Sequence, residues 1–159
     1  MNKVDEAAFE EFICRWLVEQ GGYDEVKLAQ APPDFDVISG LDRGELFTFI
    51  GLTQGAAWNE LLTRYGNDAS KAQRGFVSRL SQQLDVRGTI EVLRHGVEDL
   101  GVTLRLAYFK PASGFTPELQ ERYARNRLTV TRQLRYEAAS TKSLDLRLFV
   151  NGIRSRRPS

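Results

Sequence analysis

The sequence predicts an α/β (α+β) fold in which helices pack on a mixed β-sheet. Two observations lead to this prediction. In the N-terminal part of the chain, apolar side chains recur every three or four positions, which is the period of a helix with one apolar face. Towards the C-terminus, three segments alternate between apolar and polar side chains, as half-buried strands do, and a helical segment separates the first from the second.

The length and composition predict one globular domain with a restricted choice of chemistry. The chain has 159 residues, which is enough to bury most of its surface around one core. The net charge is +1, so any surface for nucleic acid must be a local basic patch. The chain has one cysteine, Cys14, and one histidine, His95. An internal disulfide, a cysteine zinc site and a multi-histidine site are therefore excluded, and carboxylate chemistry with Mg²⁺ remains open.

The sequence shows no targeting or membrane segment. The stretch MNKVDEAAFEEF is too acidic and too interrupted for a signal peptide. No apolar run approaches the roughly 18–20 residues that span a bilayer. We therefore predict a cytoplasmic protein with no membrane partner.

Five helices are predicted in the N-terminal part. Residues 5–20 form an amphipathic helix that Gly21-Gly22 would end. Its apolar residues are Phe9, Phe12, Ile13, Trp16 and Leu17. The mixed polarity of Tyr23–Ile38 predicts a loop with one short strand at most. The other helices are predicted around Leu46–Ile50, around Trp58–Tyr65, from a cap at Asn67 or Asp68 to Leu84, and over Ile90–His95.

Strands dominate the remainder of the chain. Residues 102–109 alternate and end at Lys110-Pro111, which predicts a strand. Thr116-Pro117 places a capping residue before a proline, the usual start of a helix, and we expect this helix to reach about Asn126. Two more strands are predicted at 128–136 and 144–150.

The last segment, SLDLRLFVNGIRSRRPS, joins a strand to a turn and a basic tail. Asn151-Gly152 is a strong hairpin signal, because both positions of a type I′ turn need φ > 0. A partner strand should follow, yet Ile153 is followed by RSRRPS, which has almost nothing to bury. The pattern predicts an unpaired edge on the strand 144–150.

Asp145 is the most informative carboxylate. It lies in an apolar strand, on the face opposite Leu144 and Leu146, and aspartate is disfavoured in strands. Two interpretations stay open, namely an edge charge that faces water and a metal-binding carboxylate on a rigid sheet. Glu10 and Glu11 in the first helix could add a second carboxylate, although an exposed glutamate is the default on an amphipathic helix.

Basic residues offer a second kind of site. Arg127, Arg132 and Arg135 on the second predicted strand could contact DNA phosphates, and a solvated strand face explains them equally well. We interpret His95 as a packed or capping residue rather than a catalytic one. Spacing therefore predicts at most an incomplete Mg²⁺ site.

Several longer stretches carry a more specific resemblance. They are FEEFICRWL, LFTFIGLTQGAAWNELLTRYG, VRGTIEVLRHGVEDLGVTLRLAYFKPASG, ERYARNRLTVTRQLRY and SLDLRLFVNGI. In these stretches, from Phe9 to Ile153, the sequence resembles the N-terminal region of the R (restriction and motor) subunit of type I restriction–modification enzymes.

The resemblance implies a fold, an activity and a set of residues. That region is a nuclease domain of the PD-(D/E)xK type, with a restriction-endonuclease-like core of helices around a mixed sheet. Its metal-binding aspartate lies in the strand that reads SLDL, which implies this role for Asp145. The FEE segment implies a second metal-binding, catalytic carboxylate at Glu10, with Glu11 as the alternative. The next strand of the family carries Glu-x-Lys, whose glutamate binds metal and whose lysine positions the attacking water.

The resemblance also implies partners and a cofactor. In the intact enzyme, ATP drives helicase-like motor domains of the same subunit along DNA, and modification and specificity subunits complete the complex. ATP would belong to those motor domains, because this sequence has no Gly-Lys-Ser/Thr phosphate-binding loop.

The sequence departs from the family after Ile153. The expected glutamate falls at the position of Ser159, and the lysine would follow it. We therefore expect residues 1–153 to be the N-terminal part of the nuclease domain, and residues 154–159 to be a basic tail from a cloning junction or a shifted reading frame. The Mg²⁺ site would be incomplete, so the chain by itself should not cleave DNA. The alternative is a non-catalytic DNA- or subunit-binding module.

Overall fold

A computed structural model describes residues 3–26, 35–36, 40–112, 114, 116–134 and 144–154. The chain divides into two compact units. Unit 1 comprises Met1–Gly44 and Arg127–Arg154, and unit 2 comprises Glu45–Asn126 and Ser155–Ser159. The described residues form six helices and eight strands, which confirms the prediction of a mixed fold with helices and a mixed sheet.

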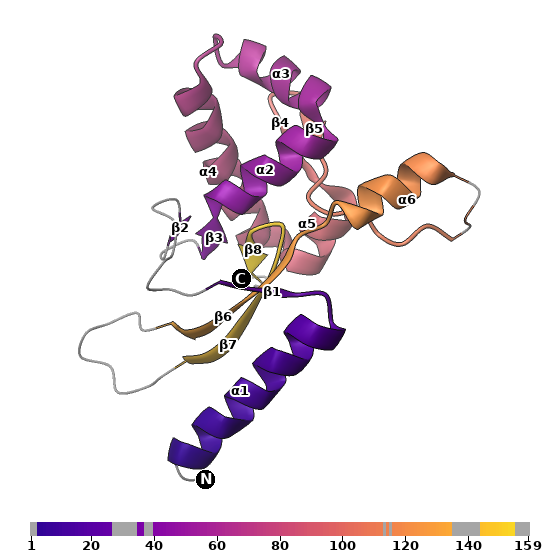
Figure 1. Ribbon diagram of the computed structural model, residues 1–159. Coiled ribbons are helices and arrows are strands. Elements are labelled where there is room, and N and C mark those ends of the chain that lie inside the picture. Colours follow the sequence, from indigo (N-terminus) through magenta and orange to yellow (C-terminus); the bar gives the residue numbers. More distant parts are fainter. Residues whose placement is uncertain are drawn as a thin grey trace. The chain divides into compact units, whose positions relative to one another are not determined.

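Unit 1 is built on a six-stranded sheet with the order β1-β6-β7-β8-β3-β2 (Figure 1). Its strands are β1 (Asp24–Val26), β2 (Phe35–Asp36), β3 (Leu41–Asp42), β6 (Leu128–Leu134), β7 (Leu144–Val150) and β8 (Ile153–Arg154). β1 is parallel to β6, and every other pair of neighbours in this sheet is antiparallel. The two ends of the chain thus contribute to one sheet, although the sequence predicted at most one strand before residue 38.

The long pair β6–β7 forms the centre of this sheet. Its register runs from Leu128 opposite Val150 to Leu134 opposite Leu144. The predicted strand 144–150 is confirmed with the same bounds, and the predicted strand 128–136 is confirmed as far as Leu134. The last two positions of that prediction lie outside the described residues.

The predicted turn at Asn151-Gly152 is confirmed, with φ values of 51° and 80°. β8 follows it directly, and Ile153 pairs with Val150 on one side and with Leu41 of β3 on the other. The unpaired edge predicted for the strand 144–150 is therefore wrong at its C-terminal end. Two residues after the turn are enough to insert β8 between β7 and β3.

Helix α1 (Lys3–Gln20) confirms the predicted first helix and begins two residues earlier. It contacts β1, β6 and β7 (Figure 1). Cys14 is buried with 2% of its surface exposed, whereas Phe9, Phe12 and Trp16 are each more than half exposed. The apolar pattern predicted the helix correctly, but it did not predict that the aromatic side chains would face away from the buried side.

Unit 2 contains five helices among its described residues, as the sequence predicted. They are α2 (Arg43–Thr53, from Glu45 onward in this unit), α3 (Gly55–Arg64), α4 (Ala69–Arg87), α5 (Thr89–His95) and α6 (Pro117–Ala124). Asp68 caps α4, since its Oδ1 accepts a 3.1 Å hydrogen bond from the backbone N–H of Lys71. The fully buried core includes Leu46, Phe49, Ile50, Leu61, Phe76, Leu80, Leu84 and Leu104.

The strand predicted at 102–109 is confirmed only over its first three residues, and its predicted length is wrong. β5 covers only Val102–Leu104 and pairs with β4 (Val97–Asp99) in a separate two-stranded sheet. The turn between them is Leu100-Gly101, with φ values of 47° and 80°. β4 was missed because three residues are too short to show alternation, and because leucine is an unusual residue in a turn with φ > 0.

Side-chain amides replace a partner strand after β5. The backbone N–H of Arg105 donates to Gln54 Oε1 at 2.6 Å, and Gln54 Nε2 donates to the Arg105 carbonyl at 2.7 Å. Asn126 binds the backbone of Tyr108 in the same way. The Tyr108 N–H donates to Asn126 Oδ1 at 3.1 Å, and Asn126 Nδ2 donates to the Tyr108 carbonyl at 2.6 Å. These two amides satisfy the backbone groups that a continued strand would have paired in a ladder.

Candidate functional site

The two predicted metal ligands lie on elements that contact each other. The backbone of Asp145 is near the start of β7, as the second residue of the strand after Leu144. The backbone of Glu10 is in α1, and α1 contacts β7 (Figure 1). Residues that are far apart in the sequence are therefore carried by one helix–sheet layer of unit 1.

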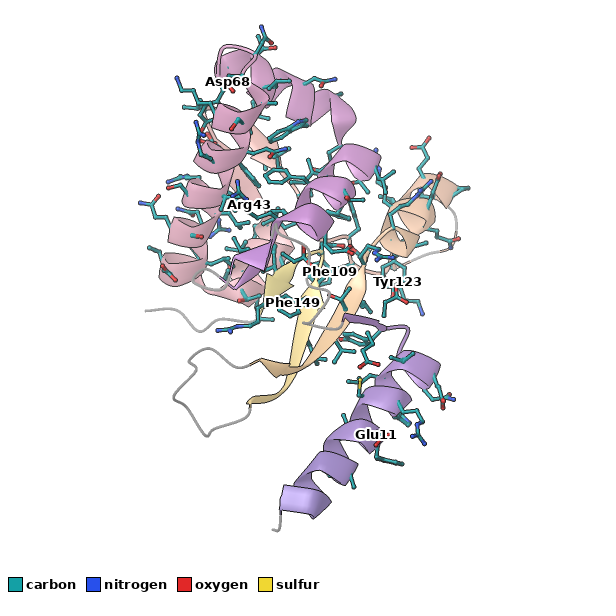
Figure 2. The ribbon with its side chains drawn as sticks, turned by 60° about the vertical axis from the view of Figure 1, so that its left-hand side comes forward. Glu11, Arg43, Asp68, Phe109, Tyr123 and Phe149 are labelled. Atoms are coloured by element: carbon teal, nitrogen blue, oxygen red, sulfur yellow. The ribbon has the colours of Figure 1, made fainter. Side chains whose placement is uncertain are left out.

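The structure describes the side chain of Glu11, which Figure 2 shows on α1. Glu11 is exposed, and its Oε1 lies 3.0 Å from Nη2 of Arg15. Position 10 lies about one helical turn before Cys14, because an α-helix has 3.6 residues per turn. Cys14 is 2% exposed. Glu11 is therefore a surface residue engaged by Arg15, and the choice between Glu10 and Glu11 stays a prediction.

The strand of Asp145 is fixed at its C-terminal end by Asn151. Asn151 is fully buried, its Oδ1 accepts a 2.7 Å hydrogen bond from the backbone N–H of Arg127, and its own N–H donates to the Arg127 carbonyl at 2.8 Å. The next residue is also anchored, since the Gly152 carbonyl accepts a 2.9 Å hydrogen bond from the N–H of Asp42. β7 therefore ends in a turn that is tied to both β6 and β3.

The structure describes two of the three predicted DNA-binding arginines, Arg127 and Arg132. Arg127, just before β6, is exposed, and its Nη1 lies 3.3 Å from Oδ2 of Asp24. Because the Arg127 and Asp24 side chains are 45% and 68% exposed, this ion pair contributes little to stability and is open to competition by a phosphate. The backbone of Arg132 is in β6, opposite Leu146. Arg135 lies outside the described residues.

A buried polar pair in unit 2 was not predicted from the sequence. Tyr65 Oη donates a 2.7 Å hydrogen bond to Oδ2 of Asp99, which is 7% exposed. Burial, and then the hydrogen bond to Asp99, raise the pKa of Tyr65 to about 12. Both residues belong to short segments with ordinary turn and strand composition, so no pattern could have singled them out. The pair joins the end of α3 to β4.

Unit 2 also has a shallow pocket of about 230 Å³ between α2 and α6. It is lined by Leu52, Thr53, Glu118, Glu121, Arg122 and Arg125. Two of its charged side chains neutralise each other, since Nη2 of Arg125 lies 3.6 Å from Oε1 of Glu121. Arg122 lies over the ring of Tyr108, with 5.8 Å between Cζ and the ring centroid.

Other features of the described residues do not add a ligand to the site on α1 and β7. His95 is exposed near Glu91, with 3.5 Å between Nε2 and Oε2. Among the described residues, no group of three or more His, Cys, Asp or Glu side chains could hold a metal ion. In the same part of the chain, no helix combines the length and the apolar character that crossing a membrane requires. Comparison with protein-family models, curated proteins and solved structures gave no match to this chain.

Proposed function

We propose that this chain is the N-terminal part of the DNA-cleaving domain of a type I restriction R subunit. The resemblance of five stretches between Phe9 and Ile153 supports this proposal. The mixed sheet with a helix against it is compatible with the restriction-endonuclease-like core that the resemblance implies. The proposed substrate is DNA.

One observation supports the proposal most directly, namely the contact between α1 and β7. The nuclease assignment needs an acidic residue on the first helix to approach the aspartate of the SLDL strand. The resemblance implies this role for Glu10, with Glu11 as the alternative. Glu11 is instead engaged with Arg15 at the surface.

The donor set fits a weak Mg²⁺ site. Asp145 and Glu10 supply carboxylate oxygens, and Mg²⁺ is commonly held by one or two carboxylates together with substrate phosphates. When bound, Mg²⁺ would supply positive charge beside the scissile phosphate and lower the pKa of a bound water. Asp145 and Glu10 would orient the ion, while Arg127 and Arg132 would hold flanking phosphates. Because these two carboxylates are the only protein ligands proposed here, we expect weak metal binding.

The proposal implies protein partners. The modification and specificity subunits and the motor domains of the same subunit are the proposed protein partners. ATP would act in those motor domains rather than on this chain, whose sequence lacks a Gly-Lys-Ser/Thr loop.

Metal binding tests the nuclease proposal. Mn²⁺ prefers the same oxygen ligands as Mg²⁺ and can be followed by electron paramagnetic resonance. It would be titrated into the chain with a short DNA duplex. We expect Asp145→Asn and Glu10→Gln to weaken Mn²⁺ binding, and the matched control Glu11→Gln to leave it unchanged. If Asp145→Asn binds Mn²⁺ as the unmodified chain does, the proposal is wrong.

The exposed side chain of Arg127 favours a second candidate, a DNA-binding module without chemistry. Such binding would rest on phosphate contacts and would weaken steeply with salt. Arg127→Gln should then reduce both the affinity and the salt dependence, whereas Asp145→Asn should not. A loss of DNA affinity in Asp145→Asn only when Mg²⁺ is present would favour the nuclease site instead.

A further inference from the structure

The turn Asn151-Gly152 holds the two parts of the sheet of unit 1 together. In the strand order, β8 stands between β7 and β3, so β3 and β2 are joined to the rest of the sheet through β8. β8 has two residues, and it pairs with β3 at Ile153, which lies opposite Leu41. The Gly152 carbonyl also accepts a 2.9 Å hydrogen bond from the N–H of Asp42 in β3. A change in the shape of this turn would therefore separate β3 and β2 from β6 and β7.

The same turn has the dipeptide sequence that is most prone to deamidation. An asparagine side chain is attacked by the backbone nitrogen of the next residue, and glycine hinders this attack least because it has no side chain. The Gly152 nitrogen forms a bond to Cγ of Asn151, and the Cγ–Nδ2 bond breaks as the proton of that nitrogen and the amide group leave as ammonia. Water then opens the cyclic imide at one of its two carbonyl carbons. The product is aspartate, or isoaspartate, in which the main chain runs through Cγ.

The folded turn holds this reaction back. Asn151 and Gly152 are buried, whereas deprotonation of the Gly152 N–H needs a base from the solvent. Attack also requires the planar amide of Asn151 to present one face to the Gly152 nitrogen. The 2.7 Å hydrogen bond from the Arg127 N–H to Asn151 Oδ1 fixes the rotation of that amide. The rate should therefore follow the fraction of molecules in which the turn is open.

The products do not fit the closed turn. Asn151 is fully buried, so aspartate would place an additional negative charge in a site that excludes water, which disfavours the folded form. Isoaspartate adds a methylene group to the main chain, and a two-residue turn with φ values of 51° and 80° cannot accommodate it. The loss of ammonia makes the change irreversible.

We propose that Asn151-Gly152 is a deamidation site that reacts when the turn between β7 and β8 opens, and that its conversion releases β8 from β3. The proposal joins three observations, namely the reactive dipeptide, its burial and the position of β8 between the two parts of the sheet. It does not rest on the nuclease assignment.

The rate of deamidation tests whether folding controls the reaction. Trypsin cleaves after Arg147 and Arg154, so the segment LFVNGIR can be analysed by mass spectrometry after the intact chain has been incubated in mildly alkaline buffer. The folded chain should deamidate about 30-fold more slowly than the synthetic peptide LFVNGIR, because its rate follows the population of the open turn. The chain in urea should match the peptide. A folded chain that reacts as fast as the peptide would overturn the proposal.

Two substitutions test whether the turn opens locally. Ile153→Ala removes a side chain that is 1% exposed and should speed deamidation by about tenfold, because it weakens the attachment of β8. Leu61→Ala is the matched control, because Leu61 is fully buried in unit 2, and it should leave the rate unchanged. Equal acceleration in the two variants would show that only unfolding of the whole chain exposes the turn, and it would refute local opening.

Asn151→Asp tests the release of β8, because it installs one of the two products. Amide exchange at Asp42, whose N–H donates to the Gly152 carbonyl, should become faster by about tenfold, whereas exchange at Val130 in the β6–β7 pair should not change. Asn67→Asp is the matched control, because Asn67 also has positive φ but is exposed, and it should leave both amides as they were. Unchanged exchange at Asp42 in Asn151→Asp would show that the product stays in the turn, and the proposed release would be wrong.

Discussion

The side chain of Asn151 and the backbone of Arg127 form a reciprocal pair. Asn151 Oδ1 accepts from the Arg127 N–H at 2.7 Å, and the Asn151 N–H donates to the Arg127 carbonyl at 2.8 Å. Asn151 does this in a left-handed conformation, with φ of 51°, and is fully buried. One residue therefore forms the turn after β7 and also fixes the start of β6.

We expect Asn151→Ala to destabilise the protein by about 2–4 kcal/mol, measured by urea unfolding. Alanine is disfavoured in the left-handed region, and the partly buried hydrogen bond from the Arg127 N–H to Asn151 Oδ1 is lost. Asn67→Ala is the matched control, because Asn67 has φ of 61° but is exposed. It should cost only about 1 kcal/mol. Equal costs at the two positions would mean that the hydrogen bond to Arg127 contributes nothing.

The phenol of Tyr65 should lose its proton at a higher pH than an ordinary tyrosine does. Its folded pKa is about 12, against an ordinary value of 10.0, because burial and Asp99 favour the neutral phenol. The sign follows from linkage: this group's contribution to stability is complete below pH 10 and is lost as the pH rises towards 12. The ultraviolet difference titration between the unmodified chain and Tyr65→Phe should isolate a transition near pH 12. A difference transition near pH 10 would contradict the assignment.

Gly75 is the place where a helix must lack a side chain. A Cβ at Gly75 would overlap the hydroxyl of Tyr65, whereas a Cβ at Gly51 of α2 would meet nothing within 4 Å. Gly51→Ala should stabilise the protein by about 0.5–1 kcal/mol through helix propensity, and Gly75→Ala should destabilise it by about 1–3 kcal/mol. In a Tyr65→Ala background, we expect Gly75→Ala to become neutral or stabilising. A Gly75→Ala chain that gains stability without that second change would show that Tyr65 yields freely.

The two amide side chains that replace a strand partner should act independently. Gln54→Ala removes both hydrogen bonds to the backbone of Arg105, and Asn126→Ala removes both hydrogen bonds to Tyr108. Each change should speed amide hydrogen exchange at its own partner by about tenfold or more, since the lost bonds protected that N–H. The other amide should exchange as before. Joint acceleration at both amides would indicate that the segment opens as one piece.

The sequence could predict the elements whose signals are local. β7 and its turn were predicted with the correct bounds, because alternation and Asn151-Gly152 act within a few residues. The β4–β5 hairpin could not be predicted for two reasons. Its strands are short, and Leu100 adopts a strained conformation with positive φ, which the surrounding packing must offset. The exposed side of α1 was also unpredictable, since a helical period does not reveal which of two apolar faces will be buried.

The residues of the candidate site also differ in how far the sequence could predict them. Asp145 could be singled out because a charge in an apolar strand breaks the local pattern. The choice between Glu10 and Glu11 needs information beyond the sequence pattern, because both are ordinary residues of an amphipathic helix. No sequence pattern predicts the hydrogen bond between Tyr65 and Asp99, since it depends on how the end of α3 lies against β4.

The last prediction concerns catalysis by the chain itself. We expect no Mg²⁺-dependent cleavage of plasmid DNA, because Asp145 and Glu10 supply at most two carboxylates and the Glu-x-Lys segment that the resemblance implies is not among the 159 residues. Supercoiled plasmid would be incubated with Mg²⁺ or Mn²⁺ and analysed on gels, with Asp145→Ala and Glu11→Ala in parallel. All three proteins should leave the plasmid intact. Nicking that disappears in Asp145→Ala and persists in Glu11→Ala would contradict this prediction, and it would mean that the two carboxylates and the bound phosphate are sufficient ligands for the reaction.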